Sequence, residues 1–97
     1  MPKKSFEERA EECVLHMSAR ATARNVGLHD VCITTGPQAR RWGVTRTHAT
    51  RILERMCNEG YLYREKIIDE KAGHLGRVLY WLTPDCQRAI LGYEAVL

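Results

Sequence analysis

The sequence predicts a single domain of the α+β class, mostly helical, in which three helices form a core and a β-hairpin and a C-terminal helix follow. Two observations predict this class. Apolar residues recur at helical spacing in three separate segments. Two short segments rich in aromatic and β-branched residues flank a glycine-containing connection, which is typical of a hairpin. A chain of 97 residues has room for one domain, which buries enough surface to fold without disulfides.

The first helix is expected over residues 6 to about 23. Ser5 and Glu8 form a capping box, in which the serine hydroxyl accepts a hydrogen bond from a first-turn N–H and the glutamate reaches back to the cap. Asn25 to Gly27 end the helix, since Asn and Gly adopt the left-handed conformation readily. One apolar face runs along the segment and comprises Phe6, Ala10, Cys13, Val14, Met17 and Ala21.

A short edge strand is expected at residues 31–34, which are largely β-branched. A second, short helix should cover about 36–42, with Pro37 in its first turn and Gly43 stopping it.

The third helix is expected from its cap, Thr45, to about Glu59, with Gly60 terminating it. Apolar residues at helical spacing indicate its buried face, namely Ala49, Ile52, Leu53, Met56 and Cys57. The opposite face is polar and holds Arg46, Thr47, His48, Thr50, Arg51, Arg55 and Asn58.

Residues 61–68 and 77–82 read as the two strands of an antiparallel hairpin. Thr83 and Pro84 then predict the start of the last helix, as a cap followed by proline at the first position. The apolar positions of that helix are Cys86, Ala89, Ile90, Tyr93, Val96 and Leu97.

Residues 38–53 carry the most informative pattern: a small residue, two polar residues, a large apolar residue, Gly, an apolar residue, and Thr before a polar helix. This pattern resembles the helix-turn-helix of winged-helix transcription regulators, broadly of the MarR-like type. Ala39 is small where two helices cross closely, Gly43 lets the turn adopt a positive φ, and Val44 fills the core beneath it. Thr45 caps the next helix so that its N-terminus can face a phosphate.

The resemblance covers roughly residues 34–82 and implies a winged helix-turn-helix domain that binds double-stranded DNA sequence-specifically, with the third helix in the major groove. The chain then divides into the first helix and its connection (1–30), the helix-turn-helix (31–60), the wing hairpin (61–82) and the C-terminal helix (83–97).

The charge distribution favours the same function. Residues 36–60 hold five Arg against two Glu, and the whole chain has a net charge of +3. The excess charge thus lies on the unit that would neutralise phosphates. The connection between the hairpin strands instead carries Asp69 and Glu70, which would repel phosphates.

The expected DNA contacts fall into three groups. Base contacts are expected from Arg46, Thr47, His48, Thr50 and Arg51. Contacts to the DNA backbone are expected from Arg40, Arg41, Thr45 and Arg55. Contacts of the wing with the minor groove or its phosphates are expected from Lys66, Lys71, His74 and Arg77.

We expect no catalytic activity, cofactor or metal. The sequence has no glycine-rich phosphate loop, no H-E-x-x-H motif and no nucleophile elbow. The spacings Cys13-x-x-His16 and His29-x-x-Cys32 are zinc-like, but the four cysteines never form C-x-x-C, and we interpret them as four separate buried thiols.

The expected role is that of a small bacterial, phage or plasmid regulator of transcription that forms a homodimer through its terminal helices. Origin binding or plasmid partition uses the same module. The alternative from another class is a winged-helix subunit whose basic face meets an acidic protein surface. No segment approaches the ~18 apolar residues of a membrane span, and the N-terminus lacks a secretory signal, so we expect a cytoplasmic, nucleoid-associated protein.

Overall fold

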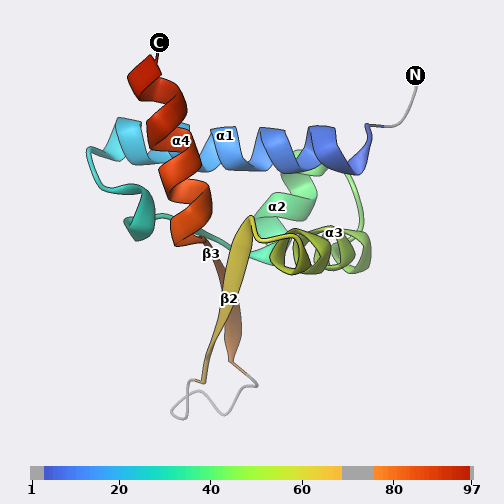
Figure 1. Ribbon diagram of the computed structural model, residues 1–97. Coiled ribbons are helices and arrows are strands. Elements are labelled where there is room, and N and C mark those ends of the chain that lie inside the picture. Colours follow the sequence, from blue (N-terminus) through green and yellow to red (C-terminus); the bar gives the residue numbers. More distant parts are fainter. Residues whose placement is uncertain (1–3, 69–75, 97) are drawn as a thin grey trace.

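The computed structural model describes residues 4–68 and 76–96, with the backbone alone for 93–96. Its elements follow the predicted order (Figure 1): α1 (Phe6–Arg24), the 3-10 turn η1 (Leu28–Asp30), β1 (Cys32–Ile33), α2 (Thr35–Trp42), α3 (Arg46–Asn58), β2 (Leu62–Ile67), β3 (Arg77–Leu82) and α4 (Pro84–Val96). Over the described residues this is a small α+β fold, mostly helical, with a three-stranded antiparallel sheet. The predicted class is confirmed at this level.

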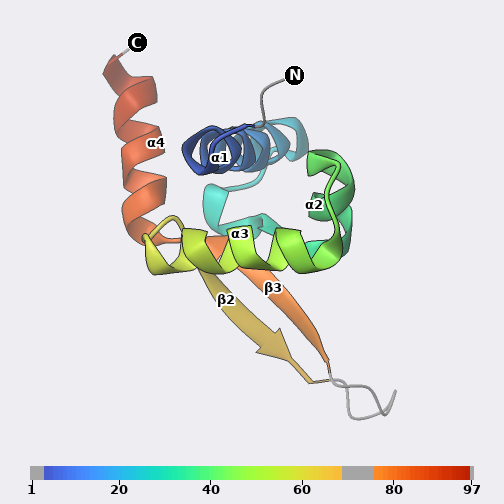
Figure 2. The same cartoon turned by 90° about the vertical axis from the view of Figure 1, so that its right-hand side faces the viewer.

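The first three α-helices surround one hydrophobic core, and the sheet closes its remaining side. Figure 2 looks along α1 and shows α2 and α3 on adjacent sides of the core, with α4 standing on the side opposite α2. β2 and β3 extend beyond α3, away from α1 (Figures 1 and 2). The fully buried side chains at the centre include Met17 from α1, Leu53 and Met56 from α3, and Leu62 and Leu82 from the sheet. The apolar faces predicted for α1 and α3 are therefore the faces that pack.

Side-chain caps begin three of the helices, as the sequence predicts. The hydroxyl oxygens of Ser5, Thr45 and Thr83 each accept a hydrogen bond from the backbone N–H three residues later, at 3.2, 3.1 and 3.1 Å. Glu8 does reach back to the cap of α1, but its carboxylate accepts from the Ser5 hydroxyl at 3.3 Å rather than from a backbone N–H. These caps fix where α1, α3 and α4 start.

The same backbone motif ends α1, α2 and α3. Asn25, Gly43 and Gly60 adopt left-handed conformations, with φ of 55°, 68° and 87°. The N–H of the next residue then donates to a carbonyl five residues back, and the three pairs are Val26 to Ala21, Val44 to Ala39 and Tyr61 to Met56. Each helix is thus stopped by its own sequence, which is why its predicted end lies within a residue of the observed one.

The strand order in the sheet is β1-β3-β2, so β1 lies at the edge, as predicted, although it is only two residues long. The hairpin register pairs Leu62 with Leu82 and Arg64 with Tyr80. Because side chains alternate along a strand, Leu62, Arg64 and Lys66 lie on the face of β2 that meets the core and α3.

The prediction of four buried thiols is wrong for three of them. Cys13 is fully buried, and burial raises the pKa of its thiol to about 12. Cys32, Cys57 and Cys86 are half-buried, because they lie on the edge strand, at the margin of the packed face of α3, and in the first turn of α4. Within residues 4–68 and 76–96, no three His, Cys, Asp or Glu side chains gather into a metal-binding group.

α4 is only partly covered by the rest of the fold. Cys86 and Ile90 pack against the core, whereas the Leu91 side chain is 56% exposed. Of the two terminal apolar faces that the sequence predicts, the one on α1 is the buried one. None of the helices in the described part of the chain is long and apolar enough to cross a membrane.

Candidate nucleic-acid interface

The turn between α2 and α3 sets the direction of α3. Gly43 takes the left-handed conformation that ends α2, and its N–H donates to the carbonyl oxygen of Arg40 at 3.2 Å. A Cβ at Gly43 would meet no atom within 4 Å, so the position needs glycine for its backbone conformation and not for space. Two residues later Thr45 caps α3, and Val44 between them packs partly against the core. The predicted positive φ of Gly43, the packing of Val44 and the capping by Thr45 are confirmed.

The outward face of α3 presents most of the predicted base-contact residues. Arg46, Thr47, His48 and Arg51 are exposed, and Thr47 and Arg51 lie one turn apart, opposite the buried Ala49 and Leu53 side. Within the described residues, neither Arg46 nor Arg51 forms an ion pair. Their guanidinium groups are thus available to a ligand with paired acceptor atoms.

Thr50 departs from this group. It is half-buried, and its hydroxyl donates to the backbone carbonyl of Arg46 at 2.9 Å. A threonine that bonds to the preceding turn in this way uses its donor within the helix. The structure thus exposes four of the five predicted base-contact residues, with Thr47 and Arg51 central on the outward face of α3, and leaves the fifth half-buried.

A groove runs between α3 and the N-terminal half of α1. One hollow has a volume of about 430 Å³. Five basic side chains and two apolar ones line it, namely Lys4, Arg9, His48, Arg51 and Arg55, and Phe6 and Ile52. A second hollow of about 550 Å³ adjoins the turn and is lined by Arg9, Gly43, Val44, Thr45 and His48. Arg9 and His48 line both hollows, and no carboxylate lines either.

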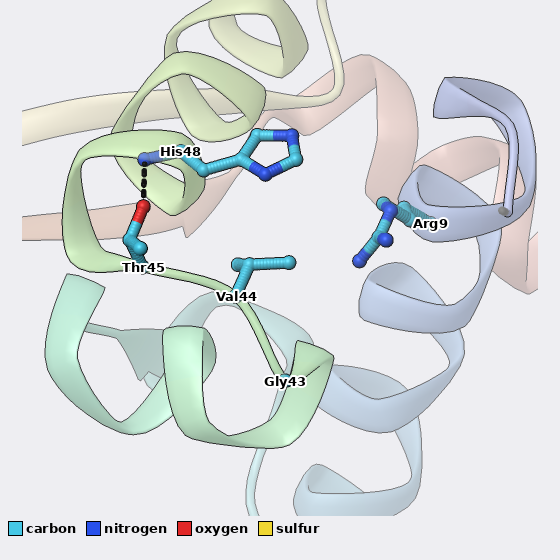
Figure 3. A pocket seen from close by; sticks show the side chains of 5 residues that line it. All are labelled: Arg9, Gly43, Val44, Thr45 and His48. Atoms are coloured by element: carbon cyan, nitrogen blue, oxygen red, sulfur yellow. Dashed lines mark hydrogen bonds between the residues drawn. The ribbon is translucent and has the colours of Figure 1, made fainter.

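Figure 3 shows the second hollow, with the guanidinium of Arg9 and the imidazole of His48 on opposite sides and Val44 between them. Arg9 is half-buried, and its Nη1 donates to the carbonyl oxygen of Trp42, at the C-terminal end of α2, at 3.5 Å. The negative end of the α2 dipole lies there, so this position favours a cation. The fold therefore positions Arg9, and this bond uses only one of the five N–H donors of its guanidinium.

Arg55 lies on the same flank of α3 as His48. Its guanidinium carbon stacks 4.0 Å from the centre of the Phe6 ring, and its Nε lies 3.5 Å from a carboxylate oxygen of Glu59. These contacts hold the side chain against α1.

The other flank of α3 faces the hairpin and is mixed in charge. Glu54 lies 3.8 Å from the guanidinium of Arg64 on β2. Lys66 and Arg77 are exposed farther along the hairpin, where Lys66 pairs with Val78 and Arg77 with Ile67 in the register. The other two predicted wing contacts, Lys71 and His74, lie outside the described residues.

The two arginines of α2 lie on different sides of their helix. Arg40 is exposed. Arg41 turns toward the middle of α1, where its guanidinium donates to the Gln38 side-chain oxygen at 3.2 Å and lies 3.6 Å from Glu12. Successive helical residues point about 100° apart, and the pair with Glu12 holds the Arg41 side chain toward α1. The structure does not bring Arg41 together with the exposed face of α3.

Arg41 instead lines a separate hollow of about 240 Å³ with His16 and Arg20. Burial and then the neighbouring guanidinium groups of Arg41 and Arg20 lower the pKa of His16. The imidazole is therefore the less charged member of this cluster at neutral pH.

The sequence interpretation missed Lys4 and Arg9. Residues 1–20 carry as many acidic as basic side chains, which conceals an asymmetry of α1. Glu8, Glu11 and Glu12 lie around Leu15 on its outer side, whereas Arg9 lies on the side of α3. Arg9 follows Phe6 by three residues and so flanks the apolar stripe, which is the signal that could have found it.

Comparison of the chain with protein-family models, with proteins of curated function and with solved structures gives no match.

Proposed function

We propose that this protein is a winged helix-turn-helix regulator of transcription, broadly of the MarR-like type, that binds double-stranded DNA sequence-specifically. The observation that carries the proposal is the outward face of α3. Thr47 and Arg51 are exposed there, Arg46 is exposed in the first turn of the same helix, and the two arginines lack ion-pair partners within the described residues.

The dimensions of α3 suit the major groove. Its 13 residues span about 20 Å at 1.5 Å per residue, and a major groove about 12 Å wide admits one α-helix. Arg51 would donate two parallel hydrogen bonds to the O6 and N7 atoms of a guanine, the commonest specific contact of this kind. Thr47, one turn earlier on the same line, would meet the neighbouring base pair.

The surroundings of α3 would hold the duplex in register. Thr45, Arg40 and Arg55 are the side chains that we assign to the DNA backbone on the helix-turn-helix. The hairpin extends past α3 (Figure 2), so its exposed Lys66 and Arg77 would reach along the duplex beyond the base-reading helix. In this proposal the hairpin is the wing.

We further propose that two copies bind together through α4. A two-fold axis would cover Leu91 and would set two α3 helices about one DNA turn, ~34 Å, apart. The operator would then be a palindrome.

One observation favours the alternative function, a protein-interaction subunit. The hairpin exposes apolar side chains that a solvated wing does not need: Tyr63 (47% exposed) and Ile67 (40%) on the outer side of β2, and Ile68 (66%) directly after the strand. A protein partner would cover them.

Selection of bound sequences from a random duplex pool, followed by fluorescence anisotropy on the consensus duplex, tests the proposal. We expect a palindromic consensus and an affinity that falls steeply as salt is raised. An absence of duplex affinity at about 50 mM salt would overturn DNA binding and leave the protein-interaction alternative.

A further inference from the structure

The two flanks of α3 differ in how their cations are paired. The groove toward α1 is lined by Lys4, Arg9, His48, Arg51 and Arg55; Lys4 pairs with Glu12 and Arg55 with Glu59, whereas Arg9 and Arg51 form no ion pair within the described residues. On the hairpin flank, Glu54 lies 3.8 Å from Arg64 and offsets its charge. A polyanion that reaches α3 therefore meets its stronger attraction on the α1 side.

Arg9 occupies the centre of that groove. It lines both hollows together with His48, and the two hollows join the interhelical turn to the middle of α3. Its contact with the Trp42 carbonyl at 3.5 Å fixes the guanidinium without neutralising it, because the partner is a neutral oxygen. A cation that is positioned but not paired binds an anion with little loss of side-chain entropy.

We infer that the hollow between Arg9 and His48 binds a phosphate of the DNA backbone, so that α1 is part of the interface. This inference rests on the proposed function, and it names a contact that lies outside the helix-turn-helix and the hairpin. The phosphate would accept from the guanidinium of Arg9 on one side and from the imidazole of His48 on the other. The positive end of the α3 dipole, beside Thr45, adds to the attraction.

Lys4 plays a smaller part in this site. Its ammonium group lies 2.6 Å from a carboxylate oxygen of Glu12, which neutralises it, and this contact lowers the pKa of Glu12. The inference therefore concerns Arg9 and His48, and Lys4 serves only to extend the positive rim.

The test measures binding to the consensus duplex over a range of salt concentrations for wild-type protein, Arg9→Gln and Arg9→Lys. Gln removes the charge but keeps a donor, and Lys keeps the charge. Arg24→Gln is the matched control, because Arg24 is an exposed arginine in the last turn of the same helix and lines none of these hollows.

We expect Arg9→Gln to make the log–log salt slope shallower by about 0.9, the value for one lost phosphate contact, on consensus and random duplexes alike. Arg9→Lys should restore most of the slope, and Arg24→Gln should leave it at the wild-type value. A purely structural role of Arg9 would change the melting temperature without changing the slope.

A second measurement locates the contacted phosphate on the DNA, with wild-type protein and one double variant. Single neutral methylphosphonate linkages are placed in turn at each position of the consensus duplex. At one position the neutral linkage should weaken binding of wild-type protein and should have a smaller effect on Arg9→Gln combined with His48→Gln, which has already lost that contact. If wild-type protein binds duplex and Arg9→Gln shows the wild-type salt slope, the inference is wrong and DNA binding stands. If wild-type protein binds no duplex, the proposed function itself fails.

Discussion

The hydroxyl of Thr83 donates a hydrogen bond to the carbonyl oxygen of Gly60 at 2.6 Å, although the two residues are 23 positions apart. The same hydroxyl oxygen accepts from the N–H of Cys86 at 3.1 Å and so caps α4. The backbone N–H of Thr83 also donates to the carbonyl oxygen of Tyr61 at 3.1 Å. One side chain thus joins the end of α3 to the start of α4, and it couples the proposed DNA-reading helix to the proposed dimer helix.

Replacing Thr83 by alanine should therefore destabilise the fold. The variant loses a helix cap and a hydrogen bond between two elements, and we expect a loss of about 1–2 kcal/mol in the free energy of unfolding. Urea denaturation followed by circular dichroism measures it. Thr47→Ala is the control on an exposed helix position and should stay within about 0.5 kcal/mol of wild type. Equal losses in both variants would contradict a linking role for Thr83.

Gly43→Ala should also destabilise the fold, but for a conformational reason. Gly43 has a φ of 68°, and a Cβ there meets nothing within 4 Å, so the loss is that of a left-handed alanine, about 1–2 kcal/mol. Gly36→Ala is the matched control within α2, because its Cβ would have only Arg40 nearby, at 4.0 Å. That variant should gain about 0.5–1 kcal/mol. The free energy of unfolding, measured with heat or urea, should therefore fall in Gly43→Ala and rise in Gly36→Ala. A shift of the same sign in both variants would refute the conformational argument.

The local features of the fold could be predicted from sequence because short-range chemistry determines them. Thr45 and Gly43 fix a helix start and a helix stop whatever surrounds them, and the spacing of Ala49, Ile52 and Leu53 identifies a buried face. The half-burial of Cys32 and Cys57 could not be predicted in this way. The exposure of a side chain at the edge of a strand or at the margin of a helix face depends on what packs beside it.

The site was predicted less completely for the same reason. Arg51 follows from the helical period alone, since it lies opposite the buried face of α3, whereas Arg46 is exposed in the first turn of the helix. Arg9 flanks the apolar stripe of α1, which marks it as a candidate, but its place beside His48 is set only when α1 packs next to α3. The contacts of Arg41 with Glu12 and Gln38 could not be predicted in full either, because the pair with Glu12 forms only when α2 packs against α1.

Arg51→Ala should reduce specificity more than overall affinity. Arg51 is exposed in the first half of α3, and a bidentate guanine contact contributes about 1–3 kcal/mol of discrimination. Anisotropy titrations should show a large loss on the consensus duplex and a small loss on random duplex. Equal losses on both would mean that Arg51 contacts only a phosphate.

Arg40→Ala and Arg41→Ala should differ from each other. Arg40 is exposed, and its loss should weaken binding to every duplex and make the salt slope shallower by about 0.9. Arg41 is held by Gln38 and Glu12 on the α1 side, so its loss should leave the slope unchanged. The salt slopes of both variants are measured on the same duplex. An equal reduction of the slope in both variants would mean that Arg41 also contacts the DNA.

Leu91→Glu should convert the dimer to a monomer without unfolding it. The Leu91 side chain is 56% exposed, so a carboxylate there is tolerated in the monomer but would meet its own copy across a two-fold axis. Leu15→Glu on α1 is the matched control, because Leu15 is 60% exposed and lies among Glu8, Glu11 and Glu12. An acidic surface of that kind repels its own copy across a two-fold axis, so α1 is the poorer dimer face and the control should remain dimeric. Light scattering at tens of micromolar protein measures the mass of each variant, and the monomer should bind a half-site duplex but lose affinity for the palindrome. Wild-type protein that scatters as a monomer without DNA would end the dimer proposal and leave a shorter, asymmetric operator.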